Sequence, residues 1–541
     1  MNTINRLRLT GLSSGMDTDS IIQSMMRMER LKLDRELRAR TKYEWKQDAL
    51  KSVSTELTAF RNTYLSVLGS KNMLTDSAYK VFNTDVQGTY KDAVTIKAGA
   101  NASIGKVTVN QISKLATADS ASSKDVSDGE SLGEGNIIRL DALNLKEALQ
   151  FDSDGNIKIS ITNARGVNSD GNPVDPVTRE FTFNKGDTLQ NMLSTINNSD
   201  VGVRMSYSRL TDGFTFEAKE TGEGGNIRLN NVTGNMFGTG GGDGAFGIRA
   251  GIYDNGQNAK LKINDVEVER RSNNFAIDGI EYTLHDTTPF TVVGGDNVYD
   301  DVNIRATITQ NVDSAVEKIK GFVEAYNSLI SKLDTMLADR KTAKEKGYLP
   351  LTDEEKSAMT EKQIEDWEAI AKKDVMYNDS DLRALLSDLR NALYDSVESA
   401  GLTPADIGLR TGNYYEGKKG QISLDEDRLR EALTKDADQV MRVFAAFPES
   451  SDPATAYKQS GFLNRVNDLM NNYTRNTVGD TQSRIDKSLY DLEKKISTME
   501  SKMLKMEEQL YARYAAMETA LSKMQSQTDW ISSMLTPQNS K

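Results

Sequence analysis

The feature that most constrains the fold is an apolar heptad pattern in the last sixty residues or so of the chain. Apolar residues recur there at alternating steps of four and three, with one doubled step of four between Met506 and Tyr514. Such spacing is typical of a coiled-coil seam, and the doubled step is a stutter that locally unwinds the supercoil. A helix of this length spans on the order of 60 Å and therefore needs a partner helix. The seam positions are Ile485, Leu489, Leu492, Ile496, Met499, Met503, Met506, Leu510, Tyr514, Met517, Leu521 and Met524.

A second long helix is predicted from Asp17 to Leu68, with Asp17, Thr18 and Asp19 as candidate N-caps. Farther along this helix, apolar positions again step by three and four, which predicts a second seam. We expect the two long helices to pair with each other. The positions of the second seam are Leu50, Val53, Leu57, Phe60, Tyr64 and Val67.

The middle of the chain has a different period. From Val81 to Asp301 it consists of short alternating runs, such as AVTIKA, IKISITN and GFTFEAK, separated by Gly, Asn and Asp, which indicates strands and turns. Glycine is dense between Thr221 and Gly256, and we expect long exposed loops or a domain edge there. After Ile304 the helical spacing returns, and the charged stretch 339–374 predicts short solvent-facing helices around Trp367.

These patterns predict an α+β multidomain protein whose long N- and C-terminal helices pair as a coiled-coil stalk, with mainly-β domains inserted between them. The predicted segments are a flexible start (1–20), the N-terminal helical part of the stalk (21–75), an inner β domain (76–120 and 258–310), an outer β domain (121–257), the C-terminal helical part of the stalk (311–524) with the charged insertion (339–374), and a flexible end (525–541).

Composition excludes several classes of partner. The net charge of −12 disfavours unspecific binding to nucleic acid, and no run of about 18 apolar residues predicts a membrane span. The chain has no cysteine, so disulfides and thiolate chemistry are excluded. The first thirty residues lack the apolar core and cleavage site of a secretory signal, so we expect any export to use another route.

Motifs for catalysis are weak. GDGAFG fits a dinucleotide fingerprint in spacing but has no predicted strand before it or helix after it, and DSDGNIKI departs from a calcium loop because Asn163 replaces the bidentate Glu. His285 is the one histidine, and its neighbour Asp286 would point to the opposite face of a strand, so we interpret His285 as an exposed residue at a strand end. We expect no enzyme activity, catalytic residue, cofactor or metal site.

Several stretches carry a resemblance to a known family. GLSSGMDTDSIIQSMMRMERLKLDREL, followed by EWKQDALKSVSTELTAFRN, closely resembles the amino-terminal region of the flagellar filament cap family, FliD or hook-associated protein 2. AKLKINDVEVERRSNNFAIDGIEYTLHDTTP, VEKIKGFVEAYNSLISKL and LTPADIGLRTGNYYEGKKGQISLDEDRLREALTKDADQVMRVF are similar to its carboxy-terminal region. Residues 181–229 look like the flagellin hook IN motif.

The resemblance implies a secreted, extracellular protein at the tip of the bacterial flagellum, which forms a ring, promotes ordered insertion of flagellin and prevents its loss. The implied partners are further copies of itself in a ring homo-oligomer (a pentamer, by resemblance), flagellin, an export chaperone and the flagellar type III export apparatus, with a host or surface ligand left open. The family has no catalytic site to transfer. We select five residues as candidate assembly contacts, with packing inside one chain as the open alternative: Ile21, Met25, Met517, Leu521 and Met524.

Three alternatives stay open on the sequence. A hook-filament junction protein or a variant flagellin shares the same order of helix, β domains and helix. A tip adhesin would bind a surface ligand through the β domains, with the glycine-rich loops of 222–256 as the first candidates. A wall hydrolase is the enzyme alternative.

Overall fold

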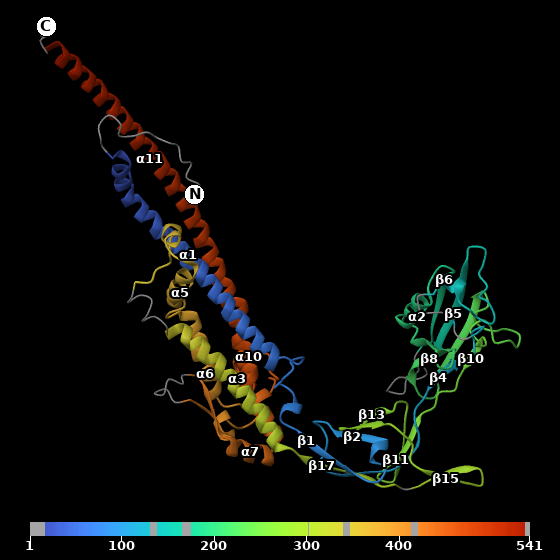
Figure 1. Ribbon diagram of the computed structural model, residues 1–541. Coiled ribbons are helices and arrows are strands. Elements are labelled where there is room, and N and C mark those ends of the chain that lie inside the picture. The colour runs from blue at the N-terminus through green and yellow to red at the C-terminus, as the bar shows by residue number, and fades with distance from the viewer. Residues whose placement is uncertain are drawn as a thin grey trace. The chain divides into compact units, whose positions relative to one another are not determined.

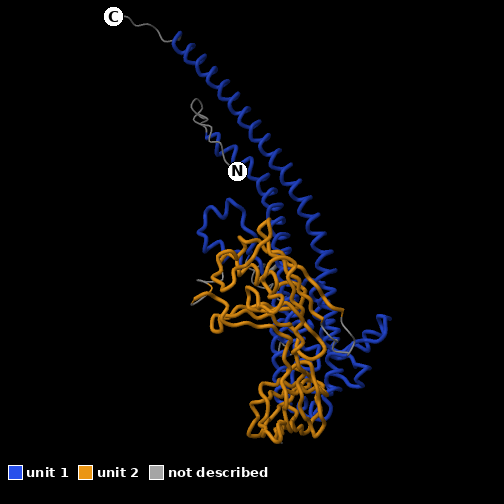
Figure 2. The backbone as a smooth tube through the Cα atoms, turned by 90° about the vertical axis from the view of Figure 1, so that its right-hand side faces the viewer, with its two compact units in different colours: residues 1–79, 312–541 blue, residues 80–311 orange. Residues whose placement is uncertain are grey.

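The computed structural model describes residues 17–129, 132, 138–164, 175–300, 302–338, 347–412 and 420–535. The chain forms two compact units, one of residues 1–79 and 312–541 and one of residues 80–311 (Figure 2). The first unit is built from both ends of the sequence, and the second is inserted into it. The finer division into an inner and an outer β domain stays a prediction, as does the flexibility of residues 1–20 and 525–541.

The first unit is helical. Its helices are α1 Thr18–Tyr64, α3 Val312–Ala338, α4 Asp353–Ser357, α5 Glu361–Ala371, α6 Ser380–Tyr394, α7 Glu426–Lys435, α8 Ala437–Ala445, α9 Pro453–Gln459, α10 Phe462–Asn472 and α11 Val478–Leu535. A π-helical turn, Tyr473–Thr477, joins α10 to α11, and a small hairpin pairs β18 Leu409–Thr411 with β19 Ile422–Leu424. Helix α11 continues past its predicted end at Met524.

Local chemistry sets the bounds of α1. Asp17 is the N-cap, because its carboxylate accepts a hydrogen bond from the Ser20 backbone N–H at 3.0 Å. The helix ends at Tyr64, and the chain then turns back so that the Met73 N–H donates to the Tyr64 carbonyl. Val67 is 69% exposed, so its predicted place in the buried seam was wrong. A Cβ on Gly69 would lie 2.6 Å from two helix carbonyl oxygens, so the turn requires glycine.

The described residues of the second unit form five antiparallel sheets and one α-helix, α2 Leu189–Asn197. Its strands are β1 Phe82–Gln87, β2 Val94–Ala98, β3 Gly105–Lys114, β4 Ala118–Ser122, β5 Asn156–Ala164, β6 Val177–Asn184, β7 Val203–Ser208, β8 Gly213–Thr221, β9 Asn226–Thr233, β10 Gly251–Tyr253, β11 Ala259–Ile263, β12 Val266–Arg270, β13 Asn274–Ile277, β14 Ile280–Leu284, β15 Phe290–Val293, β16 Asp296–Tyr299 and β17 Ile304–Gln310. The alternating runs of the sequence therefore correctly predicted strands.

Two hydrophobic clusters lie in this unit. One lies within residues 93–116 and 259–308, where the sheets β1-β17-β3-β11-β12 and β13-β14-β2 contribute their apolar side chains. The other lies within residues 121–248 and draws on the sheets β10-β9-β5-β6 and β4-β8-β7 and on α2. Strand β5 shows why: every second residue is buried, so one face of the strand points into the core.

The glycine-dense segment corrects one expectation. The segment was expected to form long exposed loops or a domain edge, yet Met236, Phe237 and Phe246 are 1% exposed or less, and the Phe246 ring stacks on Phe214 with 3.9 Å between centroids. A Cβ on Gly244, which has a positive φ of 66°, would lie 2.4 Å from the backbone nitrogen of Gly238. Glycine is dense here because the backbone folds tightly upon itself to bury aromatic rings. Residues 239–243, at the tip, are exposed as expected.

Replacing Phe246 by alanine should lower the free energy of unfolding of the second unit by about 3–5 kcal/mol, because it leaves a cavity against Phe214. Chemical unfolding of the full-length chain, followed by circular dichroism, measures this change. Leu210→Ala is the control, since Leu210 is 95% exposed and its truncation should change stability by less than about 0.5 kcal/mol. Equal effects of the two substitutions would contradict the assignment of the glycine-dense segment to the core.

Candidate assembly interface

Helices α1 and α11 lie side by side and run antiparallel (Figure 1). The Tyr511 hydroxyl donates to Asp19 at 3.0 Å, the Lys495 ammonium lies 2.8 Å from the Glu36 carboxylate, and the Gln47 amide donates to Asp486 at 2.8 Å. Residue numbers therefore fall along α11 as they rise along α1. The predicted pairing of the two long helices is confirmed, and these contacts define its register.

The C-terminal part of α1, which is the lower part in Figure 1, packs in an aromatic cluster instead of a two-helix seam. Phe60 and Tyr64 contact Phe322 of α3, each with 5.8 Å between ring centroids, and Tyr326 contacts Phe462 of α10 at 6.2 Å. Leu50, Val53, Leu57, Phe60 and Tyr64 are all buried, as predicted. Their partners come from several helices, which the heptad pattern alone could not identify.

A polar groove of about 510 Å³ separates α1 from the start of α11. It lies at the π-helical turn and is lined by residues of α1, of the turn and of α11, among them Ser54, Thr55, Thr474 and Gly479. The π turn displaces the chain locally from regular α-helical packing. This groove separates the aromatic cluster below from the α1–α11 pair above.

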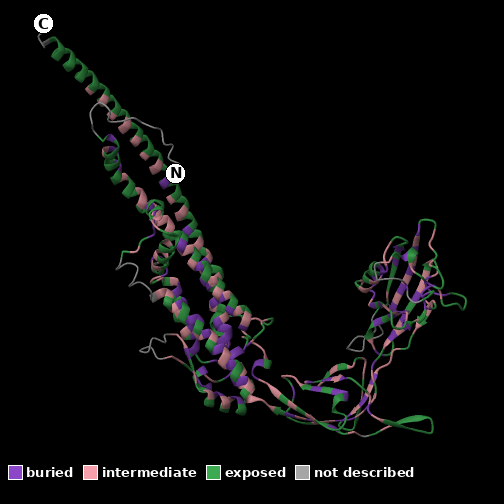
Figure 3. Ribbon diagram, viewed as in Figure 1, coloured by how far each residue is buried: buried purple, intermediate pink, exposed green. Residues whose placement is uncertain are grey.

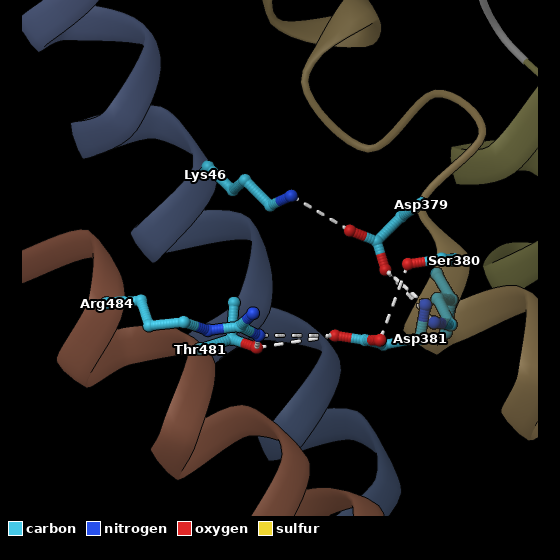
Figure 4. A network of polar contacts seen from close by, with 7 residues as sticks. Lys46, Asp379, Ser380, Asp381, Thr481 and Arg484 are labelled. Atoms are coloured by element: carbon cyan, nitrogen blue, oxygen red, sulfur yellow. Dashed lines mark hydrogen bonds and ion pairs between the residues drawn. The ribbon is translucent and has the colours of Figure 1, made fainter. Parts of the chain in front are cut away.

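A polar network joins α1, α6 and α11 beside this groove (Figure 4). The Lys46 ammonium lies 2.9 Å from Asp379, whose carboxylate also caps α6 by accepting from the Asp381 and Leu382 backbone N–H groups. Asp381 in turn accepts from the Thr481 hydroxyl at 3.3 Å, and Arg484 donates to that hydroxyl at 2.7 Å. The network thus connects α11 to α1 through the first turn of α6.

Above the network, Ile22 and Met26 of α1 are buried, whereas the α11 seam is only partly covered. In α11, Ile485 and Ile496 are buried, but Met506 is 44% and Met524 62% exposed. Figure 3 shows the far end of α11 as mostly exposed. Pairing with α1 therefore leaves part of the α11 seam uncovered. The register accounts for the exposed residues beyond Tyr514: Tyr511 already lies opposite Asp19, and α1 begins at Thr18, so these α11 residues extend past the described start of α1.

The five candidate assembly residues fall into two groups. Ile21 is half-buried, and Met25 is 52% exposed, with its sulfur 3.9 Å from the Tyr514 hydroxyl, which donates to it. These two belong to the α1–α11 pair. Met517, Leu521 and Met524 lie beyond it on α11, where Leu521 is half-buried and the two methionines are exposed. Their role in assembly stays a prediction.

The sequence pattern did not predict the exposed apolar residues at the end of α11. Trp530, Ile531 and Met534 are 50–67% exposed on the last turns of α11. They fall in the segment that we had assigned as flexible. A signal was present, because the alternation of four and three continues from Met524 through Thr528 to Ile531 and Leu535, interrupted by one polar residue.

The charged insertion packs on α1. Within it, α4 and α5 each begin with a capping box, and the Trp367 indole donates to the Leu349 carbonyl at 2.8 Å. Arg38 of α1 lies 2.6 Å from Glu355, and burial, with help from Glu355, raises the pKa of Asp34 although Arg38 opposes the shift. The predicted short helices around Trp367 are confirmed, and residues 339–346 lie outside the described part.

The described residues contain no group of carboxylates and histidine that could hold a metal ion, and no described helix is long and apolar enough to cross a membrane. His285 is exposed at the end of β14, as predicted, and its Nε2 lies 2.7 Å from the Thr95 hydroxyl. The calcium-like stretch forms a turn: the Asp152 carboxylate accepts from the Asp154 and Asn156 N–H groups at the start of β5.

Comparison with known proteins gives consistent matches. Residues 14–119 match the family model described as the flagellar hook-associated protein 2 N-terminus, and residues 256–526 match the model of the C-terminus of the same family. Flagellar hook-associated protein 2 of Halalkalibacterium halodurans is 26% identical, over 96% of this chain and 98% of the relative. The proteins of the same name from Thermotoga maritima and Salmonella typhimurium are each 25% identical, over 67% and 66% of this chain and 54% and 68% of the relatives.

Among solved structures, the flagellar cap protein FliD of Escherichia coli (domains D1-D2-D3) is similar to this chain, with a TM-score of 0.47 and 20% identity. The match covers 79% of this chain and 96% of that structure.

The register of α1 and α11 can be tested by cross-linking, because the chain has no cysteine of its own. The double variant Gln47→Cys/Asp486→Cys should be joined efficiently by a short bis-maleimide, since the native side chains are in hydrogen-bond contact. The control Gln47→Cys/Lys495→Cys should react poorly, because Lys495 lies about 13 Å farther along α11. Mass spectrometry of the monomer measures both yields. Equal yields, or the reverse order, would contradict this register.

Proposed function

This chain belongs to the flagellar hook-associated protein 2 family, whose members are structural flagellar cap proteins, and from this premise we propose that it forms a ring at the distal end of a flagellar filament, where it promotes ordered insertion of flagellin and prevents its loss. The observation that carries the proposal is the family match at both ends of the sequence, which are the two parts that pair as α1 and α11.

The end of α11 supports the proposal physically. Met524, Trp530, Ile531 and Met534 expose large apolar surface on one helix, and such surface on a protein usually marks a contact with another molecule. In the proposed cap, this helix end contacts the helices that line the filament end. No buried apolar side chain is found in the described residues of α11 beyond Ile496, so this helix end can adjust as subunits are added.

The proposed mechanism is mechanical. A ring with fewer subunits than the filament has positions per helical turn does not match every position at once, so it leaves a gap into which one flagellin can enter. Weak contacts then let the ring advance by one position. No bond chemistry is required, and the proposed function includes no enzyme activity.

The proposed partners are further copies of this chain, flagellin, an export chaperone and the flagellar type III export apparatus, and the proposed location is extracellular, at the filament tip. A pentameric ring remains the expectation from the family resemblance. For the tip-adhesin alternative, the glycine-rich segment offers only its exposed tip, residues 239–243, because the rings of Phe237 and Phe246 in the same segment are buried.

The double variant Met524→Asp/Trp530→Asp should slow filament growth on the order of tenfold or more, because it places charge on the proposed contact with the filament end. The assay adds purified full-length protein and flagellin from the same source to filament seeds and measures filament length by electron microscopy. The control Gln527→Asp changes a polar residue of the same helix.

Light scattering must show the same oligomer for both variants, which separates filament contact from ring formation. Normal growth with Met524→Asp/Trp530→Asp would exclude the α11 end as the filament contact. If filaments grow equally fast without the protein, the proposed function itself is contradicted.

A further inference from the structure

The hairpin of β15 and β16 is exposed on both faces. Its two strands pair with each other and with no other described strand. Phe290, Val292, Val293 and Val298 are 46–62% exposed, and Figure 3 shows the hairpin as exposed throughout most of its length. Facing pairs in the register place Phe290, Val292 and Tyr299 on one face and Val293 and Val298 on the other. Apolar residues on both faces are typical of a strand that is covered on both sides.

The base of this hairpin is firmly held. The Thr288 side chain is 1% exposed, its N–H donates to the Ile112 carbonyl of β3, and its hydroxyl accepts from the Ile112 N–H. On the other side, the Val302 N–H donates to the Asn110 carbonyl. The hairpin therefore starts from two fixed points on its own sheet. An isolated two-stranded hairpin is marginally stable in water, so the exposed apolar part calls for a partner.

The charges of the hairpin indicate which partner fits. Residues 286–303 contain four aspartates and no lysine or arginine. Two copies of the hairpin would repel each other, because Asp296 and Asp300 are both exposed. A partner surface should therefore be basic.

The solvent-facing side of the five-stranded sheet in the same unit is rich in basic residues. The strand registers place five basic residues on the face away from the core: Lys106, Lys114, Lys260, Lys262 and Arg305. The acidic residues of this face, Asp85, Glu267 and Glu269, lie on the two edge strands β1 and β12. Glu269 pairs with Lys260 at 3.4 Å and Asp265 with Lys262 at 3.9 Å, so basic residues remain in excess on the face. The hairpin does not cover this face of the sheet in its own chain, because the apolar side chains of the hairpin are exposed to solvent.

We propose that the β15–β16 hairpin of one copy docks on the basic outer face of the five-stranded sheet of the next copy. Such a contact joins two different surfaces, and a head-to-tail contact of this kind generates a ring when the rotation closes. The inference rests on the proposed function, because it assumes that the chain assembles into a ring. It adds which surfaces hold neighbouring copies together.

Cross-linking between two single-cysteine chains tests the contact, since the sequence supplies no other cysteine. Full-length Val292→Cys and Lys262→Cys chains, distinguished by a size tag, are mixed and treated with a short bis-maleimide. The expected product is a mixed dimer, formed on the order of tenfold more than with the control pair Val232→Cys and Lys262→Cys, in which the 48% exposed Val232 of β9 replaces the hairpin position. A yield no higher than the control, or Val292→Cys chains joined mainly to each other, would overturn the proposal.

Charge reversal gives a second, independent readout. Asp296→Lys should weaken self-association in light scattering about tenfold, and adding Lys262→Glu should restore part of it. No weakening, or no restoration, would contradict the hairpin contact. If the unmodified chain forms rings that cap filaments while the cross-link stays at control level, the proposed function stands and this inference fails. If the chain forms no ring even on filament ends, the proposed function fails, while a specific Val292–Lys262 cross-link would still establish the contact.

Discussion

The antiparallel register of α1 and α11 is the constraint on which the helical unit depends. Three polar contacts, Tyr511 to Asp19, Lys495 to Glu36 and Gln47 to Asp486, place two segments from opposite ends of the sequence side by side. The length of each helix then decides what is left uncovered. Since α1 begins at Thr18 and α11 runs to Leu535, the last turns of α11 extend beyond the described start of α1 and expose Met524, Trp530 and Met534.

Packing changes in character along this pair. The aromatic cluster of Phe60, Tyr64, Phe322, Tyr326 and Phe462 anchors the lower end, and dispersion and hydrophobic burial make it the most stable part. Above the polar groove at the π turn, the buried apolar side chains, such as Ile22, Met26 and Ile496, are scattered, and the mostly exposed hydrogen bonds and ion pairs between the helices each contribute about 1 kcal/mol or less. The helix pair is therefore held firmly at one end and loosely at the other, which suits an end that must contact changing partners.

Much of this was predictable from the sequence. Heptad spacing predicted both long helices, Asp17 was correctly identified among the candidate caps, and alternation predicted the strands. The partners of the α1 seam were not predictable, because apolar spacing shows which face is buried but not what covers it. The exposed last turns of α11 were missed because Thr528 interrupts the pattern. The glycine-rich segment was expected to be exposed but is so only at its tip, residues 239–243, because composition does not distinguish a flexible loop from a backbone that needs glycine for close approach, as at Gly244.

The most direct test of the account is hydrogen exchange of the full-length protein, measured by mass spectrometry with and without filament ends. For the free protein we predict the strongest protection around Leu57 to Tyr64, weaker protection in the upper α1–α11 pair, and the weakest in α11 beyond Tyr514. On addition of filament ends, residues 517–535 should gain protection while the aromatic cluster stays unchanged. If residues 517–535 exchange equally fast in both states, while binding to the filament is verified independently, the central claim that this helix end contacts the filament is contradicted.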